Sequence, residues 1–130
     1  DLVGEVHSVE NVPEASEDGR HNARANDIGN VVFHTRKVED YLRDLVSEQG
    51  AFPEDAAVVV DPPRAGMHPK ALRRLLELAP RRVLYVSCKP AMLAREMPAF
   101  LETCDVSGMS AVDMFPHTPH VELVVQFERR

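Results

Sequence analysis

Cysteine is scarce in this sequence, where only Cys88 and Cys104 are found among 130 residues. Two thiols do not make a disulfide framework, so we expect a protein of the reducing cytoplasm. No apolar run approaches the roughly 20 residues of a membrane-spanning helix, and no signal peptide is visible. An initiator methionine is also absent. The chain starts at Asp1 just before a strand-like segment, and we therefore expect a piece of a larger protein.

Positive charge is lacking overall, since the formal net charge is −6. This balance disfavours a stand-alone nucleic-acid-binding protein, because contact with phosphates favours basic surfaces. The charge is unevenly distributed, however, and residues 61–101 carry eight basic and three acidic side chains. This basic block is either the solvated surface of helices or the surroundings of a site for an anionic partner.

Apolar residues recur with alternating strand and helix spacing. Strands are predicted at 5–9, 31–34, 57–60, 83–86, 106–112 and 121–127, and helices beginning near residues 13, 38, 69 and 90. Pro98 is expected to kink or split the last helix. The alternation predicts a single-domain α/β fold with a mostly parallel sheet and helices on both faces.

Ligand sites in such sheets lie at the carboxyl ends of the strands. The apolar run Val83–Val86 ends in Ser87-Cys88-Lys89-Pro90, where the cation of Lys89 and the start of a helix both favour a thiolate. Cys88 is therefore a candidate nucleophile, although a cysteine at a strand end is more often an inert small core residue. Cys104, which follows apolar helix residues, is predicted to be such a core residue.

Two other strand ends carry acids. Asp61-Pro62-Pro63-Arg64 follows the third strand, and its prolines would present a carboxylate and a guanidinium in fixed positions. The alternative is an ordinary turn with a surface ion pair. Glu10 closes the first strand, where an acid commonly binds a ribose in nucleotide-binding folds.

The segment Asp113–Glu122 contains two acids and two histidines. His117 and His120 could form a zinc site with Cys88, but closed zinc sites need four ligands, so we favour a role in fixing the loop. Glu122 enters an apolar strand and is a candidate general base. The alternative for Glu122 is a surface acid at the edge of a strand.

Three motifs occur in order: Asp-Pro-Pro-Arg-x-Gly at 61–66, Leu-Tyr-Val-Ser-Cys at 84–88 and Asp-Met-Phe-Pro-His-Thr-x-His-Val-Glu at 113–122. With Val9–Pro13 and Asn22–Asn26, they resemble the RNA uracil-5-methyltransferase family. The resemblance runs from about Val6 to the end. It implies that residues 1–130 are the C-terminal portion of a catalytic domain with a Rossmann-like, S-adenosylmethionine-dependent methyltransferase sheet.

The resemblance also implies the chemistry. Cys88 would be the nucleophile that adds to carbon 6 of uracil, and Glu122 would be the general base that removes the proton from carbon 5. The product would be 5-methyluridine in ribosomal or transfer RNA, whose target base must be unstacked to enter the site. By analogy, Glu10 and Asp61 would bind S-adenosylmethionine, and Arg64, His117 and His120 would bind substrate or position the loop.

The sequence departs from the family pattern in several places. Lys89 stands where the family usually has Asn, Met92 where it usually has Thr, and Arg36-Lys37 where an acid or amide commonly meets the adenine. The family's glycine-rich cofactor loop and its first strand, which would lie in the middle of the sheet, are absent. We therefore expect the 130 residues alone to bind cofactor weakly, not to turn over, and to form a homodimer through exposed strand edges.

Two other functions remain open from the sequence. One is a non-catalytic RNA- or nucleotide-binding module that kept the fold, although such a module would not need Cys88 or Glu122. The other is a methyltransferase acting on a different atom, which would not need a thiol. The fold alone does not distinguish these functions.

Overall fold

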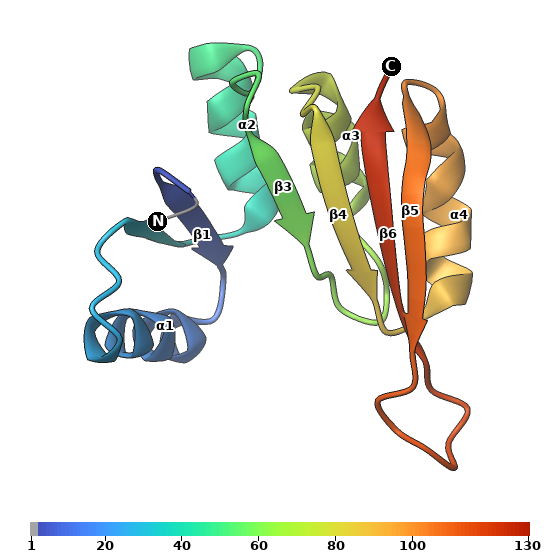
Figure 1. Cartoon of the computed structure of the whole chain (residues 1–130). Coiled ribbons are helices and arrows are strands. Elements are labelled where there is room, and N and C mark those ends of the chain that lie inside the picture. The colour runs from blue at the N-terminus through green and yellow to red at the C-terminus, as the bar shows by residue number, and fades with distance from the viewer. Residues whose placement is uncertain (1–2) are drawn as a thin grey trace. The chain divides into compact units, whose positions relative to one another are not determined.

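The structure, a computed structural model, describes residues 3–130. These residues form two units, one reaching up to Asp44 and one running from Leu45 to Arg130, which we call the N-terminal unit and the C-terminal unit. The strands form two sheets, a pair in the first unit and a sheet of four in the second (Figure 1).

The N-terminal unit contains β1 (Val6–Glu10), α1 (Pro13–Ala25), β2 (Val31–Thr35) and the first part of α2 (Val38–Gln49). Parallel pairing joins β1 to β2, from Val6 opposite Val31 to Glu10 opposite Thr35. These two strands pair with each other and with no other strand of residues 3–130.

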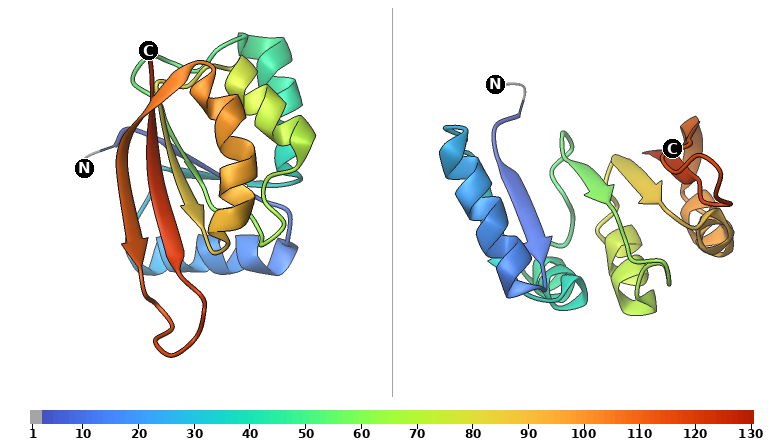
Figure 2. Two further views of the ribbon diagram at one scale, coloured as in Figure 1. Left: turned by 90° about the vertical axis from the view of Figure 1, so that its right-hand side faces the viewer. Right: turned by 90° about the horizontal axis from the view of Figure 1, so that it is seen from below.

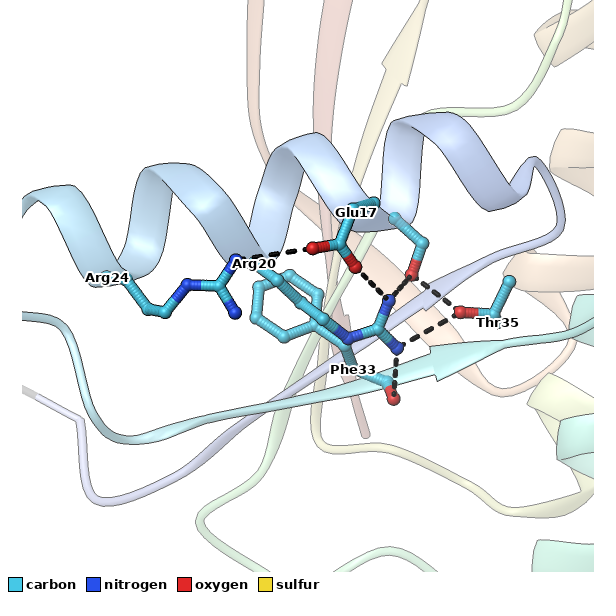
Figure 3. A network of polar contacts seen from close by, with 6 residues as sticks. Glu17, Arg20, Arg24, Phe33 and Thr35 are labelled. Atoms are coloured by element: carbon cyan, nitrogen blue, oxygen red, sulfur yellow. Dashed lines mark hydrogen bonds and ion pairs between the residues drawn. The ribbon is translucent and has the colours of Figure 1, made fainter.

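A polar network fixes α1 against β2 (Figure 3). Ser16, which is 3% exposed, shares a hydrogen bond of 2.7 Å with the Thr35 hydroxyl. The Arg20 guanidinium donates to Ser16 Oγ at 3.1 Å and to Thr35 Oγ1 at 3.1 Å, and it lies 5.4 Å from the centre of the Phe33 ring. A helix with few apolar residues is thus attached through hydrogen bonds and a cation–π contact.

The C-terminal unit holds a mixed four-stranded sheet. Its elements are β3 (Ala57–Val60), α3 (Pro69–Glu77), β4 (Arg82–Ser87), α4 (Pro90–Leu101), β5 (Cys104–Val112) and β6 (Glu122–Arg129). The strand order is β3-β4-β6-β5, with β6 between β4 and β5 (Figure 1). The mostly parallel sheet predicted from the sequence is wrong here: β3 runs parallel to β4, but β6 is antiparallel to both neighbours.

One face of this sheet is packed and the other is open. Figure 2 shows α3 and α4 on the same side, so these two helices do not cover both faces as predicted. On the packed face Tyr85 and Phe127 are fully buried, and Phe100 of α4 stacks on Phe127 with ring centres 4.4 Å apart. On the open face Val59 is 66% exposed, and its cross-strand neighbour Leu84 is only partly buried.

Helix α4 continues through Pro98, so of the two predicted effects of this proline the split does not occur. The buried residues Leu93 and Phe100 anchor the helix on both sides of the proline, which offsets the lost hydrogen bond. Cys104 is buried as predicted, but it begins β5 instead of ending a helix. Within residues 3–130, no helix is long and apolar enough to cross a membrane.

Two histidines meet on the N-terminal unit beside Tyr41. His7 Nδ1 lies 3.0 Å from His34 Nε2 and 3.1 Å from the Tyr41 hydroxyl, while His7 Nε2 contacts Glu5 at 2.7 Å. Burial lowers the pKa of His34, and the neighbouring His7 and Arg36 lower it further. The neutral form of His34 is therefore favoured in the folded chain.

We expect the unit to lose stability in mild acid. Because the folded pKa of His34 lies below its unfolded value, the contribution of His34 is complete above about pH 6.5 and is lost as the pH falls through the folded pKa. Denaturant titrations between pH 7.5 and 5 measure this loss. His34→Gln should make the free energy of unfolding depend less steeply on pH over this range. The same substitution at His21, an exposed residue of α1, should leave that pH dependence unchanged.

Candidate active site

Strand β4 places Cys88 at the sheet edge where α4 begins. Ser87 is 5% exposed, and its hydroxyl accepts a hydrogen bond from the Lys89 backbone N–H at 3.2 Å. This turn carries the chain directly into Pro90, the first residue of α4. Cys88 is a free, partly buried thiol beside the amino end of the helix, where the dipole favours negative charge.

Strand β6 places Glu122 next to this thiol. In the antiparallel ladder Ser87 lies opposite Leu123, and the next residues outward on the two strands are Cys88 and Glu122. The thiol and the carboxylate, 34 positions apart in sequence, therefore meet at one end of two paired strands.

A cavity of about 240 Å³ lies at this edge. It is lined by Arg64, Cys88, Phe115, Thr118, His120 and Glu122. Its volume is below the roughly 300–1,000 Å³ of pockets that enclose a whole drug-sized ligand. A cavity of this size fits one small ring better than a whole drug-sized molecule.

The loop between β5 and β6 forms one wall and extends beyond the end of the sheet (Figure 1). Phe115 to Thr118 form a turn in which the Thr118 N–H and hydroxyl both donate to the Phe115 carbonyl, at 3.1 and 2.7 Å. His117 occupies the left-handed region, with φ 71°, as the third residue of the turn after Pro116. Phe115 and Thr118 were not predicted as cavity residues, although both lie within the Asp113–Glu122 motif.

The structure brings together four of the seven predicted site residues: Arg64, Cys88, His120 and Glu122. The guanidinium of Arg64 approaches His120 Nδ1 at 3.4 Å. His117 lies in the same loop but does not line the cavity.

The two predicted cofactor residues lie at strand ends outside this cavity. Asp61 follows β3 and is exposed, and its carboxylate makes no hydrogen bond or ion pair with the rest of residues 3–130. Glu10 ends β1, and its Oε1 accepts the Val12 N–H at 2.7 Å, which leaves Oε2 available. Acceptor oxygens at strand ends fit ribose hydroxyl groups chemically. The two acids belong to different units.

Arg36, one of the departures from the expected family pattern, forms an ion pair with an acid of α2. Its guanidinium contacts Asp44 Oδ2 at 2.6 Å. This hydrogen bond, together with those from Arg43, lowers the pKa of Asp44. The Arg36 cation therefore has its own acidic partner.

The zinc alternative finds no support in the geometry. In the part of the chain that the structure describes, no group of three or more His, Cys, Asp or Glu side chains could hold a metal ion. His117 lies outside the cavity that Cys88 and His120 share.

Comparison with known proteins identifies the family. Residues 17–130 match the tRNA (uracil-5-)-methyltransferase family. The chain is 44% identical over 127 residues to the 23S rRNA (uracil(1939)-C(5))-methyltransferase RlmD of Klebsiella pneumoniae, a match that covers 96% of this chain and 28% of that protein. It is 41% identical over 128 residues to an uncharacterized RNA methyltransferase of Bacillus cereus, covering 98% of this chain and 27% of the relative.

A solved structure extends the likeness to the fold. The tRNA (uracil-54, C5)-methyltransferase of Pyrococcus abyssi, in complex with S-adenosyl-L-homocysteine, matches with a TM-score of 0.78 and 32% identity, over 95% of this chain and 28% of that chain. The chain belongs to the tRNA (uracil-5-)-methyltransferase family, and the predicted Rossmann-like α/β fold is confirmed. It spans about 27% of the length of the Bacillus cereus relative.

The two thiols should differ sharply in reactivity. Cys88 is partly exposed at the cavity, whereas Cys104 is 5% exposed in the core. We expect iodoacetamide to label the folded chain once, at Cys88, and the urea-unfolded chain twice. Peptide mass mapping measures this, and labelling of Cys104 at the same rate as Cys88 in the folded chain would contradict the burial of Cys104.

Proposed function

We propose that the chain is the C-terminal part of the catalytic domain of an RNA uracil-5-methyltransferase, and that it supplies the nucleophile and the general base. The observation that carries this proposal is that Cys88 and Glu122 line one small cavity. A nucleophile and a base that act on adjacent carbons of one ring need this proximity. The family membership supports the same reaction.

Cys88 activates the ring. Carbon 5 of uracil is not nucleophilic enough to accept a methyl group directly. Addition of the Cys88 thiolate to carbon 6 forms a carbon–sulfur bond and moves the double-bond electrons into an enolate, so that carbon 5 becomes the nucleophile.

Glu122 completes the reaction. Once carbon 5 carries the methyl group, its remaining proton must leave. The Glu122 carboxylate accepts this proton, the electrons of the carbon–hydrogen bond restore the ring double bond, and the carbon–sulfur bond to Cys88 breaks. The enzyme thiolate is regenerated for the next cycle.

The proposed reaction needs a methyl donor and an RNA substrate. S-adenosylmethionine supplies the methyl group from its sulfonium. Glu10 and Asp61 would hold that cofactor, while Arg64, His117 and His120 would hold the nucleotide or the loop that covers it. The RNA is ribosomal or transfer RNA with an unstacked uridine, and the reaction belongs in the cytoplasm, where thiols stay reduced.

The experiment uses a chimera in which this chain replaces the matching region of the Klebsiella pneumoniae enzyme. With S-adenosylmethionine and RNA carrying 5-fluorouridine, fluorine cannot leave as the proton does, so a stable RNA–protein adduct should accumulate. We expect intact mass under denaturing conditions to show this adduct, peptide mapping to place it on Cys88, and Cys88→Ala to abolish it. Methyl transfer to ordinary RNA by Cys88→Ala would contradict the mechanism.

A matched variant separates the two steps. Glu122→Gln keeps the size of the side chain but removes the base, so an adduct should accumulate even on RNA containing ordinary uridine. Turnover should fall by about 10²–10⁴-fold, the usual contribution of a general base. Glu102→Gln, a substitution at an exposed acid beyond α4, serves as the control.

The 130-residue chain alone should neither turn over nor bind cofactor strongly, because its sequence contains no glycine-rich loop for S-adenosylmethionine. Titration calorimetry measures the affinity, and a micromolar dissociation constant would contradict this expectation. The edge of β3 that does not face β4 should pair with a second copy. Light scattering measures that association, and a monomer at high concentration would contradict it.

A further inference from the structure

Glu96, in the middle of α4, uses both oxygens of its carboxylate on two other segments. Oε1 accepts the backbone N–H of Met67 at 2.8 Å, and Oε2 accepts the hydroxyl of Tyr85 at 2.7 Å. No lysine or arginine of residues 3–130 forms an ion pair with Glu96. A carboxylate without a cationic partner, held by two neutral donors, has its position fixed at both ends.

The first donor belongs to the loop that carries Arg64. Pro63 to Gly66 form a turn closed by the Gly66 N–H, which donates to the Pro63 carbonyl at 2.8 Å. Gly66 has φ 85°, and a Cβ built on it would overlap Glu96 Oε1. The loop backbone therefore lies directly against the carboxylate, and this close approach accounts for the glycine of the Asp-Pro-Pro-Arg-x-Gly motif.

The second donor belongs to the strand that carries Cys88. Tyr85 lies in β4, three residues before Cys88, and its side chain is completely buried. Its ring packs edge-on against Phe100, with centres 6.0 Å apart at an interplanar angle of 83°. Burial first, and then the hydrogen bond to Glu96, raise the pKa of Tyr85, so the phenol stays protonated and remains a donor.

Glu96 thus joins three segments: the loop that contains the Pro63–Gly66 turn and Met67, β4 and α4. Arg64 is the second residue of the turn, and within the described chain its guanidinium has one polar contact, the 3.4 Å approach to His120. Because His120 itself lies in an exposed loop, this contact alone holds the Arg64 side chain only weakly. The position of Arg64 beside Cys88 therefore depends on how the turn is held.

We propose that Glu96 is a positioning residue, which fixes the Pro63–Gly66 turn to β4 and thereby holds Arg64 against the cavity beside Cys88. The consequence for catalysis rests on the proposed function, but the attachment itself does not. Glu96 would not touch the substrate, and its effect on the reaction would pass through Arg64.

The attachment is tested by amide hydrogen exchange of the 130-residue chain. In Glu96→Ala the Met67 N–H loses its acceptor, and its exchange should become about tenfold faster, the effect of losing one hydrogen bond to a charged group. Glu96→Gln keeps a carbonyl oxygen that accepts the Met67 N–H, and its amide group can still hydrogen-bond the Tyr85 hydroxyl. The Met67 amide should therefore keep most of its protection from exchange in this variant. The control is Glu102→Gln, and unchanged Met67 exchange in Glu96→Ala would overturn the proposal.

A second variant covers the case in which Glu96→Ala does not fold. Tyr85→Phe removes only the hydroxyl donor and leaves the ring in the core. It should loosen the carboxylate and accelerate Met67 exchange by a smaller factor than Glu96→Ala. Protection equal to that of the unsubstituted chain would overturn the role of β4 in holding the turn.

The effect on catalysis is tested in the chimera with a double-mutant cycle. Arg64→Gln and Glu96→Ala should each raise KM for RNA more than they lower kcat, and the double variant should be no worse than Arg64→Gln within about twofold. Multiplicative losses would show that Glu96 acts independently of Arg64, and would overturn the proposal.

The two hypotheses fail separately. If the chimera without further substitutions forms no adduct with 5-fluorouridine RNA, the proposed function fails, while the exchange of the Met67 amide still decides the attachment. If the adduct forms and Met67 exchange does not respond to Glu96, the function stands and the positioning role of Glu96 is wrong.

Discussion

The antiparallel pairing of β4 with β6 determines both the core and the cavity. Its register sets Ser87 opposite Leu123, which sends Cys88 and Glu122 out of the same end of the ladder. The same register points Tyr85 and Val125 into the packed face. A slip of one residue would exchange the two faces of β6, so the hydrophobic core itself holds the thiol and the carboxylate in place.

The register of the sheet does not fix the positions of the loops. Polar contacts fix the loop that carries Arg64. The turn that carries Arg64 lies beyond the last residue of β3, where no strand pairing reaches it. The carboxylate of Glu96 in α4 and the buried phenol of Tyr85 attach this turn to β4 instead. Hydrogen bonds of this kind are directional, so they specify a position that apolar packing alone would leave free. The site thus combines an apolar framework with a few polar attachments.

The sequence predicted the parts that depend on local pattern. The apolar run Val83–Val86 predicted β4, and the polar residues that follow it indicated Cys88 as a candidate nucleophile. The motif that contains His120 indicated Glu122 as a candidate base. The order of the strands was not accessible, because the same alternation fits a final strand at the edge or one inserted between two others. Glu96 was not accessible either: it occupies an ordinary helical position, and its role arises only where three separate segments meet.

The insertion of β6 has a consequence for how the protein is made. A ribosome synthesises β5 before β6, yet β5 reaches the sheet only through β6, its partner in the ladder. A nascent chain that ends before Glu122 therefore leaves one edge of β4 bare and β5 without a place in the sheet. Such an intermediate exposes strand edges that favour aggregation. Residues 122–129 thus complete the four-stranded sheet and bring Glu122 to the cavity in one event, and a chain truncated there would lack both.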